Sequence, residues 1–297
     1  MDVKQLQLFV ETVKLGSFAA AARGEGVDPS SVSRQIASLE ERLGVRLFQR
    51  TTRSLSLTEE GEAYWRRVEP LLEELARAED AVQMLDGQPR GRLRLSSSVA
   101  FGQTKIVPLL GAFKARYPEL QVELHMTDAN VDLIAERMDL AVRLSAHLEG
   151  DLIATRLMTT RYRVCASPDY LQRAGKPSLP ADLAGHDCLM FTLAAFRNTW
   201  KFQTSEGRLE EVAIDGHFSF SSALALKSAA LQGMGPALLA DWMTDEDVRA
   251  GRLIDLFPRY QVTATNFETA AWLIYLSRSF LPLKTRVMID FLKTELG

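Results

Sequence analysis

The residues with the clearest chemical capacity lie in one short stretch that follows Asp28-Pro29. It contains small hydroxyls and one guanidinium: Ser30, Ser31, Ser33, Arg34 and Ser38. Such hydroxyls exchange hydrogen bonds with bases and phosphates without bulk, and a guanidinium pairs with guanine or phosphate. Arginines at positions 42, 46, 50 and 53 follow, with no acidic residue between them. The whole chain has a formal net charge of −3, so only a local patch like this one could meet a nucleic acid.

A helix beginning here would hold these side chains on its outer face. Asp28 is a good N-cap, and Pro29 suits the first helical position, where its missing N–H has no partner to lose. Apolar residues then fall on one face at spacings of four, three and four: Val32, Ile36, Leu39 and Leu43. The opposite face carries Ser30, Arg34, Ala37 and Glu41, with the other serines on the flanks. We expect a buried stripe and a small polar face suited to a major groove.

Two earlier helices and a later hairpin complete the predicted domain, residues 1–58. Leu6, Phe9, Val10 and Val13 recur at helical spacing, and Ser17 is placed to cap a second helix. The segment after residue 47 alternates apolar and polar residues, which predicts a short basic hairpin that could touch the DNA backbone or minor groove. A three-helix bundle with an ordinary solvated polar face is the alternative.

One long helix is predicted from Glu59 to Asp86, with Thr58 as its cap, in a linker segment at 59–87. Its apolar residues alternate spacings of four and three: Tyr64, Val68, Leu71, Leu75, Ala78, Val82 and Leu85. A heptad seam of this kind favours pairing with a second helix, and so a homodimer. Packing against the core of the same chain is the alternative.

Strand and helix patterns alternate after Gly91, which predicts an open, mostly parallel α/β sheet in residues 88–297. We expect strands at 92–99, 122–128, 140–144, 152–158 and 161–167, and helices at 103–117, 131–138, 169–175 and 223–233. Sheets of this kind bind ligands at the carboxyl ends of their strands. Polar residues stand at the ends of three of these elements: Ser98 at the end of the first strand, Thr127-Asp128 at the end of the second, and Ser221-Ser222 at the start of a later helix. Ordinary helix caps would explain each of them separately.

Several function classes find no support. No nucleophile elbow or phosphate-binding loop occurs, and the four histidines lack metal-ligand spacing, so we expect no enzyme, no metal and no cofactor. No stretch suits a signal peptide or a bilayer span, so we expect a cytoplasmic protein without a membrane partner. Cys165 and Cys188 could form a redox switch, although their apolar surroundings favour buried thiols without reactivity.

The N-terminal motifs closely resemble those of the LysR-type transcriptional regulators. The resemblance is carried by Gly16-Ser17-Phe18, Ala19-Ala20-Ala21, Ser33-Arg34-Gln35-Ile36, Leu39-Glu40, Leu43-Gly44, Leu47-Phe48-Gln49-Arg50 and Leu57-Thr58-Glu59-Glu60-Gly61. It is dense over about the first sixty residues and looser along the rest of the chain. It implies a winged helix-turn-helix, a linker helix that pairs antiparallel with its copy, and an effector domain like the periplasmic binding proteins.

The resemblance also implies roles for particular residues. Arg50 and Arg53 would contact flanking phosphates or the minor groove. The residues that would enter the major groove are Ser30, Ser31, Ser33 and Arg34. The effector domain would have one subdomain at about 91–160 plus 267–297 and a second at about 161–266. A cleft between them would gather Ser97, Ser98, Thr127, Asp128, Arg143, Trp200, Phe202, Ser221 and Ser222. Arg143 would pair with a carboxylate of an unidentified small-molecule effector, and Trp200 or Phe202 would pack against its apolar body.

Three functions compete on this evidence. The favoured one is a regulator that binds promoter DNA under the control of a small effector, as a homodimer or, as in much of the family, a homotetramer, with RNA polymerase as a further candidate partner. The second is an architectural DNA-binding protein whose C-terminal domain only oligomerises. The third, a metabolic enzyme with a DNA-binding appendage, lacks a catalytic constellation.

Overall fold

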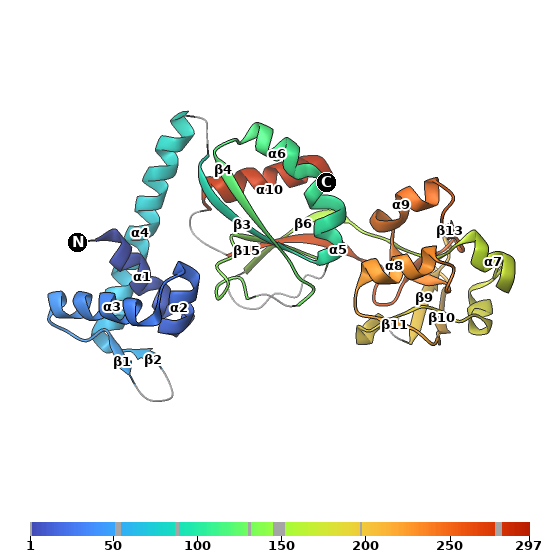
Figure 1. The fold of residues 1–297 in the computed structure, drawn as a ribbon, viewed down its shortest axis with the longest axis horizontal. Helices are drawn as coiled ribbons and strands as arrows, with labels where there is room; N and C mark the ends of the chain where they lie inside the picture. Colours follow the sequence, from blue (N-terminus) through green and yellow to red (C-terminus); the bar gives the residue numbers. More distant parts are fainter. Residues whose placement is uncertain are drawn as a thin grey trace.

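The computed structural model describes residues 2–50, 55–86, 89–129, 132–144, 152–196, 198–276 and 281–297. An N-terminal helical domain is followed by a long helix, a first α/β subdomain and a second one in a row (Figure 1). Within the described residues no helix is long and apolar enough to cross a bilayer. The same part of the chain has no cluster of histidine, cysteine or acidic residues that could hold a metal ion.

The N-terminal domain contains three short helices: α1 (Val3–Leu15), α2 (Phe18–Glu25) and α3 (Pro29–Leu43). Their caps are those the sequence predicts. The Ser17 hydroxyl accepts from the backbone N–H of Ala20 at 3.3 Å, and the Asp28 carboxylate accepts from that of Ser30 at 2.7 Å. Each helix ends at a glycine in the left-handed conformation, as at Gly16 and Gly44, a geometry that a residue with a Cβ disfavours.

The apolar stripe of α3 packs into the core of this domain. Val32, Ile36 and Leu39 are fully buried and contact Phe9 and Leu47, among others. Leu43 is 36 % exposed, which corrects the expectation that it completes the stripe. It is the last residue of the helix, and the chain turns away at Gly44 before another element covers it.

The wing consists of β1 (Phe48–Arg50) and β2 (Leu55–Leu57), which pair antiparallel with Phe48 opposite Leu57. Its base is held by Glu40, which is 3 % exposed. The Glu40 carboxylate accepts from the backbone N–H groups of Leu47 at 2.8 Å and Phe48 at 3.2 Å, and from the Arg46 guanidinium at 2.9 Å. One α3 side chain therefore fixes the start of the wing.

The linker helix α4 runs from Glu59 to Asp86 without interruption, through Pro70. Thr58 caps it, because its hydroxyl accepts from the backbone N–H of Gly61 at 2.9 Å and donates to the Arg46 carbonyl at 2.6 Å. A Cβ on Gly61 would lie 2.0 Å from the Leu47 carbonyl oxygen, so only glycine fits between the helix and the wing.

The proposed pairing seam divides into two parts. Tyr64 and Val68 pack into the core of their own N-terminal domain, and Val68 is 4 % exposed. At these two positions the helix therefore packs against its own chain, which was the alternative to pairing. Leu71, Leu75 and Val82 are 65 %, 38 % and 67 % exposed, and Ala78 is exposed with them. The side chain of Leu85 lies outside the described residues. An uncovered apolar stripe therefore begins one turn beyond the N-terminal domain.

The first α/β subdomain contains a five-stranded sheet in the order β4-β3-β5-β15-β6. Its strands are β3 (Gly91–Ser97), β4 (Leu120–Met126), β5 (Leu140–Arg143), β6 (Leu152–Thr159) and β15 (Ala270–Leu276). β3 is parallel to β4 and β5, whereas β15 is antiparallel to both of its neighbours. The C-terminal helix α10 (Leu283–Leu296) meets α6 (Leu110–Arg116) on one face of this sheet, where Phe291 and Phe113 pack edge to face at 5.1 Å (Figure 1).

Two predicted helices of this subdomain differ from the structure. The segment predicted at 103–117 is three short pieces, η1 (Gly102–Ile106), η2 (Val107–Leu109) and α6 (Leu110–Arg116), and the short helix α5 (Val99–Phe101) precedes them. The described part of the segment predicted at 131–138 forms turns instead of a helix. The Asp132 carboxylate accepts from the backbone N–H groups of Ile134 at 2.9 Å and Ala135 at 3.0 Å, which closes a tight turn there.

The second subdomain has a larger sheet in the order β10-β9-β14-β7-β12, with β13 also paired to β7, and every one of these pairs is antiparallel. The expectation of a mostly parallel sheet is therefore wrong here. In the described part of this subdomain, parallel pairing is limited to the short strands β8 and β11 and a bridge from Leu189 to Ala237. The strands are β7 (Tyr162–Ala166), β8 (Met190–Phe191), β9 (Thr199–Gln203), β10 (Leu209–Ala213), β11 (Ser219–Phe220), β12 (Ala237–Ala240), β13 (Ile254–Asp255) and β14 (Gln261–Thr263). Its helices are α7 (Pro168–Ala174), η3 (Pro180–Gly185), η4 (Ala194–Phe196), α8 (Ala223–Leu231) and α9 (Asp241–Arg249).

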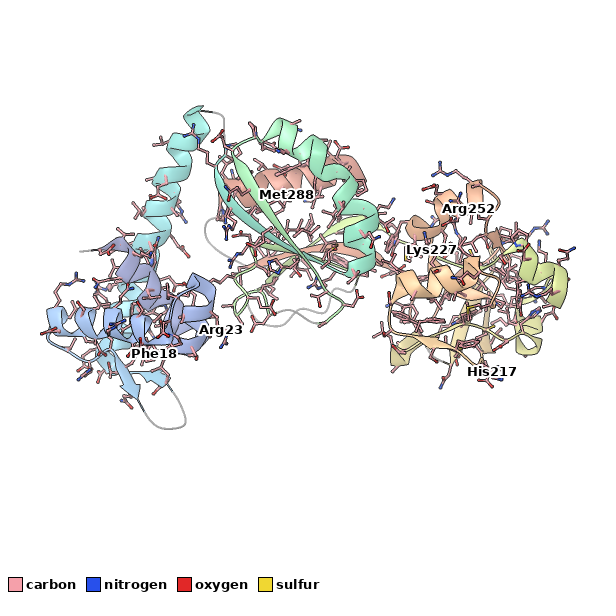
Figure 2. All side chains as sticks on the ribbon, viewed as in Figure 1. Phe18, Arg23, His217, Lys227, Arg252 and Met288 are labelled. Carbon is pink, nitrogen blue, oxygen red and sulfur yellow. The ribbon has the colours of Figure 1, made fainter. Side chains whose placement is uncertain are left out.

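A buried ion network joins α8 to α9. Asp247 is 5 % exposed, and its carboxylate accepts from Lys227 at 3.0 Å and from Arg252 at 2.7 Å. Figure 2 labels both cations on neighbouring elements of the second subdomain. These hydrogen bonds lower the pKa of the Asp247 carboxyl, against the effect of its burial. The network supports the packing of the two helices, and both cations are already engaged with protein oxygens.

Candidate DNA interface and effector site

The outer face of α3 presents the polar residues that the sequence places there. Ser30, Arg34 and Ser38 are exposed, and Ser31 and Ser33 are half-buried on the flanks. The hydrogen bonds of Ser30 and the positive charge of Arg34 lower the pKa of the Asp28 carboxyl. Asp28 therefore stays ionised and keeps capping the end of α3 from which these side chains project.

The basic residues of the wing are only partly described. Arg50 ends β1, opposite Leu55, and nothing is described of its side chain. Arg53 lies outside the described residues. The sequence did not single out Glu40 for a role, although a signal was present: it lies four residues after Ile36, so an acid falls on the apolar face of α3.

Five of the predicted effector residues meet at the carboxyl ends of β3, β4 and β5. Ser97 ends β3, opposite Met126 on one side and Val142 on the other, and Arg143 ends β5. The backbone N–H of Thr127 donates to the Ser97 carbonyl at 2.9 Å. The Asp128 carboxylate accepts from the backbone N–H of Val99 at 3.0 Å, which closes the turn that follows Ser98.

Arg143 is half-buried in this cluster, and part of its guanidinium is already hydrogen-bonded to the protein. Its guanidinium donates to the Ser96 hydroxyl at 2.8 Å and to its neighbour's carbonyl, that of Val142, at 2.9 Å. Burial lowers the pKa of the guanidinium, and the negative charges of Asp128 and Glu136 oppose this effect. The arginine therefore stays charged at the edge of the sheet.

Three buried polar atoms in this region have no hydrogen-bond partner within the described residues: the hydroxyls of Ser97 and Ser98 and the indole N–H of Trp242. Ser98 precedes α5 but its side chain makes no capping bond. Trp242, from α9 of the second subdomain, packs edge to face on Phe101 at 5.2 Å. A buried polar group without a partner is costly, so these atoms mark where a ligand or water would bind.

Four predicted residues of the second subdomain do not join this cluster. Trp200 and Phe202 are 2 % and 0 % exposed and lie in the core of that subdomain, which corrects the expectation that they pack against an effector. They stand two residues apart in β9, so both face the same side of the sheet, and that side is the core. The Ser222 hydroxyl caps α8 by accepting from the Ala225 N–H at 3.4 Å, and Ser221 is exposed beside it.

Both cysteines are fully buried and unpaired. Burial is the main cause that raises the pKa of each thiol, Cys165 and Cys188, to about 12. A thiol in this state carries almost no thiolate at neutral pH, and the thiolate is the reactive species. The structure gives no support to a redox role at either position.

Comparison with known proteins agrees with this architecture. Residues 3–62 match the family described as bacterial regulatory helix-turn-helix protein, lysR family, and residues 86–297 match the LysR substrate binding domain. The HTH-type transcriptional regulator CrgA of Neisseria meningitidis is 38 % identical over 99 % of this chain and 97 % of its own. The chain belongs to the LysR family of transcriptional regulators.

Further relatives and solved structures resemble the chain over nearly its whole length. The HTH-type transcriptional regulator DmlR of Escherichia coli is 31 % identical over 98 % of this chain and 93 % of its own. The solved structure of CrgA covers 100 % of this chain and 99 % of its own, with a TM-score of 0.64 and 37 % identity. Full-length AphB of Vibrio cholerae, a virulence activator, covers both chains fully at a TM-score of 0.61 and 26 % identity. The chain is thus a DNA-binding regulator with an effector-binding domain, and not an enzyme.

Proposed function

We propose that this LysR-type protein binds promoter DNA through the outer face of α3 and that a small molecule bound at the ends of β3, β4 and β5 modulates that binding. The observation that carries the effector site is the group of buried donors without partners, Ser97, Ser98 and Trp242. Ser97 lies opposite Val142, the residue before the charged Arg143. Hydroxyls, an indole N–H and a guanidinium all donate, so the effector would present acceptor oxygens, as a small carboxylate does.

The two halves of the proposal use different parts of the chain. The α3 face and the wing would contact one half-site, with Ser30, Ser31, Ser33 and Arg34 in the groove and Ser38, Arg50 and Arg53 toward phosphates. Pairing through the exposed stripe of α4 would give the homodimer that reads a near-palindrome. Association of effector domains into a tetramer, contact with RNA polymerase and a cytoplasmic location, where the DNA lies, complete the proposed role.

Arg34 gives the test of base reading. Replacing it with alanine should weaken binding to the selected operator by roughly 5- to 150-fold, because a good bidentate contact to a base contributes about 1–3 kcal/mol. The measurement is a competition gel shift at fixed salt with an operator selected from a random-sequence pool. Arg116→Ala removes an exposed arginine far from α3 and serves as the control. Unchanged discrimination between operator and random DNA in Arg34→Ala would exclude a base-reading role.

A thermal-shift screen of the full-length protein against small carboxylates, amino acids and aromatic acids tests the effector site. A ligand at a hundred times its dissociation constant should add about 2.7 kcal/mol to the free energy of unfolding. Arg143→Ala should abolish the response to a carboxylate. Trp242→Phe, which removes only the indole N–H, should weaken it. Arg156→Ala, an exposed arginine on β6, is the control. A ligand whose response survives both Arg143→Ala and Trp242→Phe binds elsewhere.

A further inference from the structure

The turn between β4 and β5, described over residues 132–138, is held in place by buried side chains and by hydrogen bonds. Leu133 and Met138 are 5 % and 4 % exposed and pack with Ile274 of the sheet. The Asp132 carboxylate closes the start of the turn through two backbone N–H groups. Asp139, which follows it, accepts from the Arg94 N–H at 2.9 Å and from Lys284 at 2.7 Å. The turn is therefore anchored to the first subdomain at both of its ends.

Arg137 extends from this turn to the N-terminal domain. Its guanidinium pairs with the Glu11 carboxylate on α1 and donates to the Ala21 carbonyl on α2 at 3.1 Å. Figure 2 shows Arg23, on the same helix as Ala21, at the side of the N-terminal domain that faces the first subdomain. One side chain of the effector domain thus contacts two helices of the DNA-binding domain.

The contact is partly shielded from water, and its charges are complementary. The side chains of Arg137 and Glu11 are 17 % and 24 % exposed, so salt screens their attraction less than that of a surface pair.

The backbone at Arg137 is also unusual. Its φ is +52°, and it is the one residue other than glycine with a positive φ in the described part of the chain. This conformation costs free energy in a residue with a Cβ, so the surrounding contacts must hold it. The buried anchors of the turn and the two contacts with the N-terminal domain supply that support.

The same turn borders the proposed effector site. Glu136, next to Arg137, is one of the two acids whose charge opposes the pKa depression of Arg143. A carboxylate bound at Arg143 would compete with Glu136 for that positive charge. The turn therefore contacts the domain that would bind DNA and acts electrostatically on the residue that would bind an effector.

We infer that the turn at 132–138 is a docking surface for the DNA-binding domain of the same chain and that Arg137 is its anchor. Docking fixes how α3 is presented relative to the effector domain. The inference rests on the proposed function for its consequence at DNA, whereas the docking contact itself can be tested without DNA or effector.

Hydrogen exchange of the full-length protein followed by mass spectrometry tests the contact. Arg137→Glu should increase exchange at least threefold in both α1–α2 and the turn, and Glu11→Arg should do the same. The double variant Arg137→Glu with Glu11→Arg restores an opposite-charge pair and should return exchange toward that of the natural protein. Arg137→Gly removes the side chain but keeps the positive φ, which glycine tolerates. It should increase exchange in α1–α2 while leaving the turn protected.

Unchanged exchange across residues 3–25 in both Arg137→Glu and Arg137→Gly would overturn the inference. So would a double variant that is looser than either single one. Arg34→Ala separates this result from the DNA-binding proposal, because it should impair operator binding without changing exchange in the turn. A failed operator test with an intact Arg137–Glu11 rescue would refute base reading by α3 and leave the docking contact standing.

Discussion

Replacing Glu40 with alanine should destabilise the N-terminal domain by about 2–6 kcal/mol, because two backbone N–H groups, those of Leu47 and Phe48, would lose their acceptor. Each buried donor left without a partner costs about 1–3 kcal/mol. The base of the wing would open and operator binding would fall with it. Calorimetry of the full-length protein should show the transition of this domain lowered by more than about 10 °C.

Glu41→Ala provides a matched control, since it removes an exposed acid from the next position of the same helix. Glu40→Gln keeps one acceptor oxygen and should lose less stability than Glu40→Ala. If Glu40→Ala and Glu41→Ala melt at the same temperature, the Glu40 hydrogen bonds do not hold the wing.

Replacing Leu71 with aspartate should convert the proposed dimer to monomer at micromolar concentration. Burying a leucine contributes about 1.5–3 kcal/mol, and the carboxylate would add a desolvation penalty. A two-fold symmetric dimer contains the substitution in both protomers, so the free-energy loss is doubled. The dissociation constant of the dimer should therefore rise by at least about 1,000-fold. Sedimentation equilibrium measures this directly.

Arg77→Asp also introduces an acid on α4, but outside the heptad seam, and should leave the dimer intact. Operator affinity should drop with Leu71→Asp, because a monomer binds one half-site only. A variant that stays dimeric would show that the exposed stripe of α4 is not the pairing surface.

Local signals in the sequence predict the N-terminal part of the fold well. The caps at Ser17 and Asp28 and the bounds of α4 at Glu59 and Asp86 depend on neighbours within a few residues, and the structure confirms them. The stripe of α3 follows from helical spacing alone, except at Leu43, where the helix ends too early for another element to cover it.

Pairings between distant segments are predicted less well. Strand direction in the second sheet depends on which segments meet across the fold, and alternation of strands and helices does not encode it. Apolar composition suggested a helix near 131–138, but the Asp132 side chain takes the N–H groups that a helix would use. The donors at Ser97 and Trp242 come from different subdomains, so no local pattern could have joined them.

The close fit at Gly61 has a mechanical consequence. There is no space between the Leu47 carbonyl and the start of α4. The wing and the helix must therefore move together as one rigid body. The 28 residues of the helix span about 42 Å at 1.5 Å per residue. A rotation of the helix by about 5° about its C-terminal end would therefore displace the DNA-binding domain by about 4 Å. This is close to the roughly 3.4 Å rise of one base pair. In the proposed dimer, small changes in the angle between the two α4 helices would thus change the operator spacing that the protein accepts by about one base pair at a time.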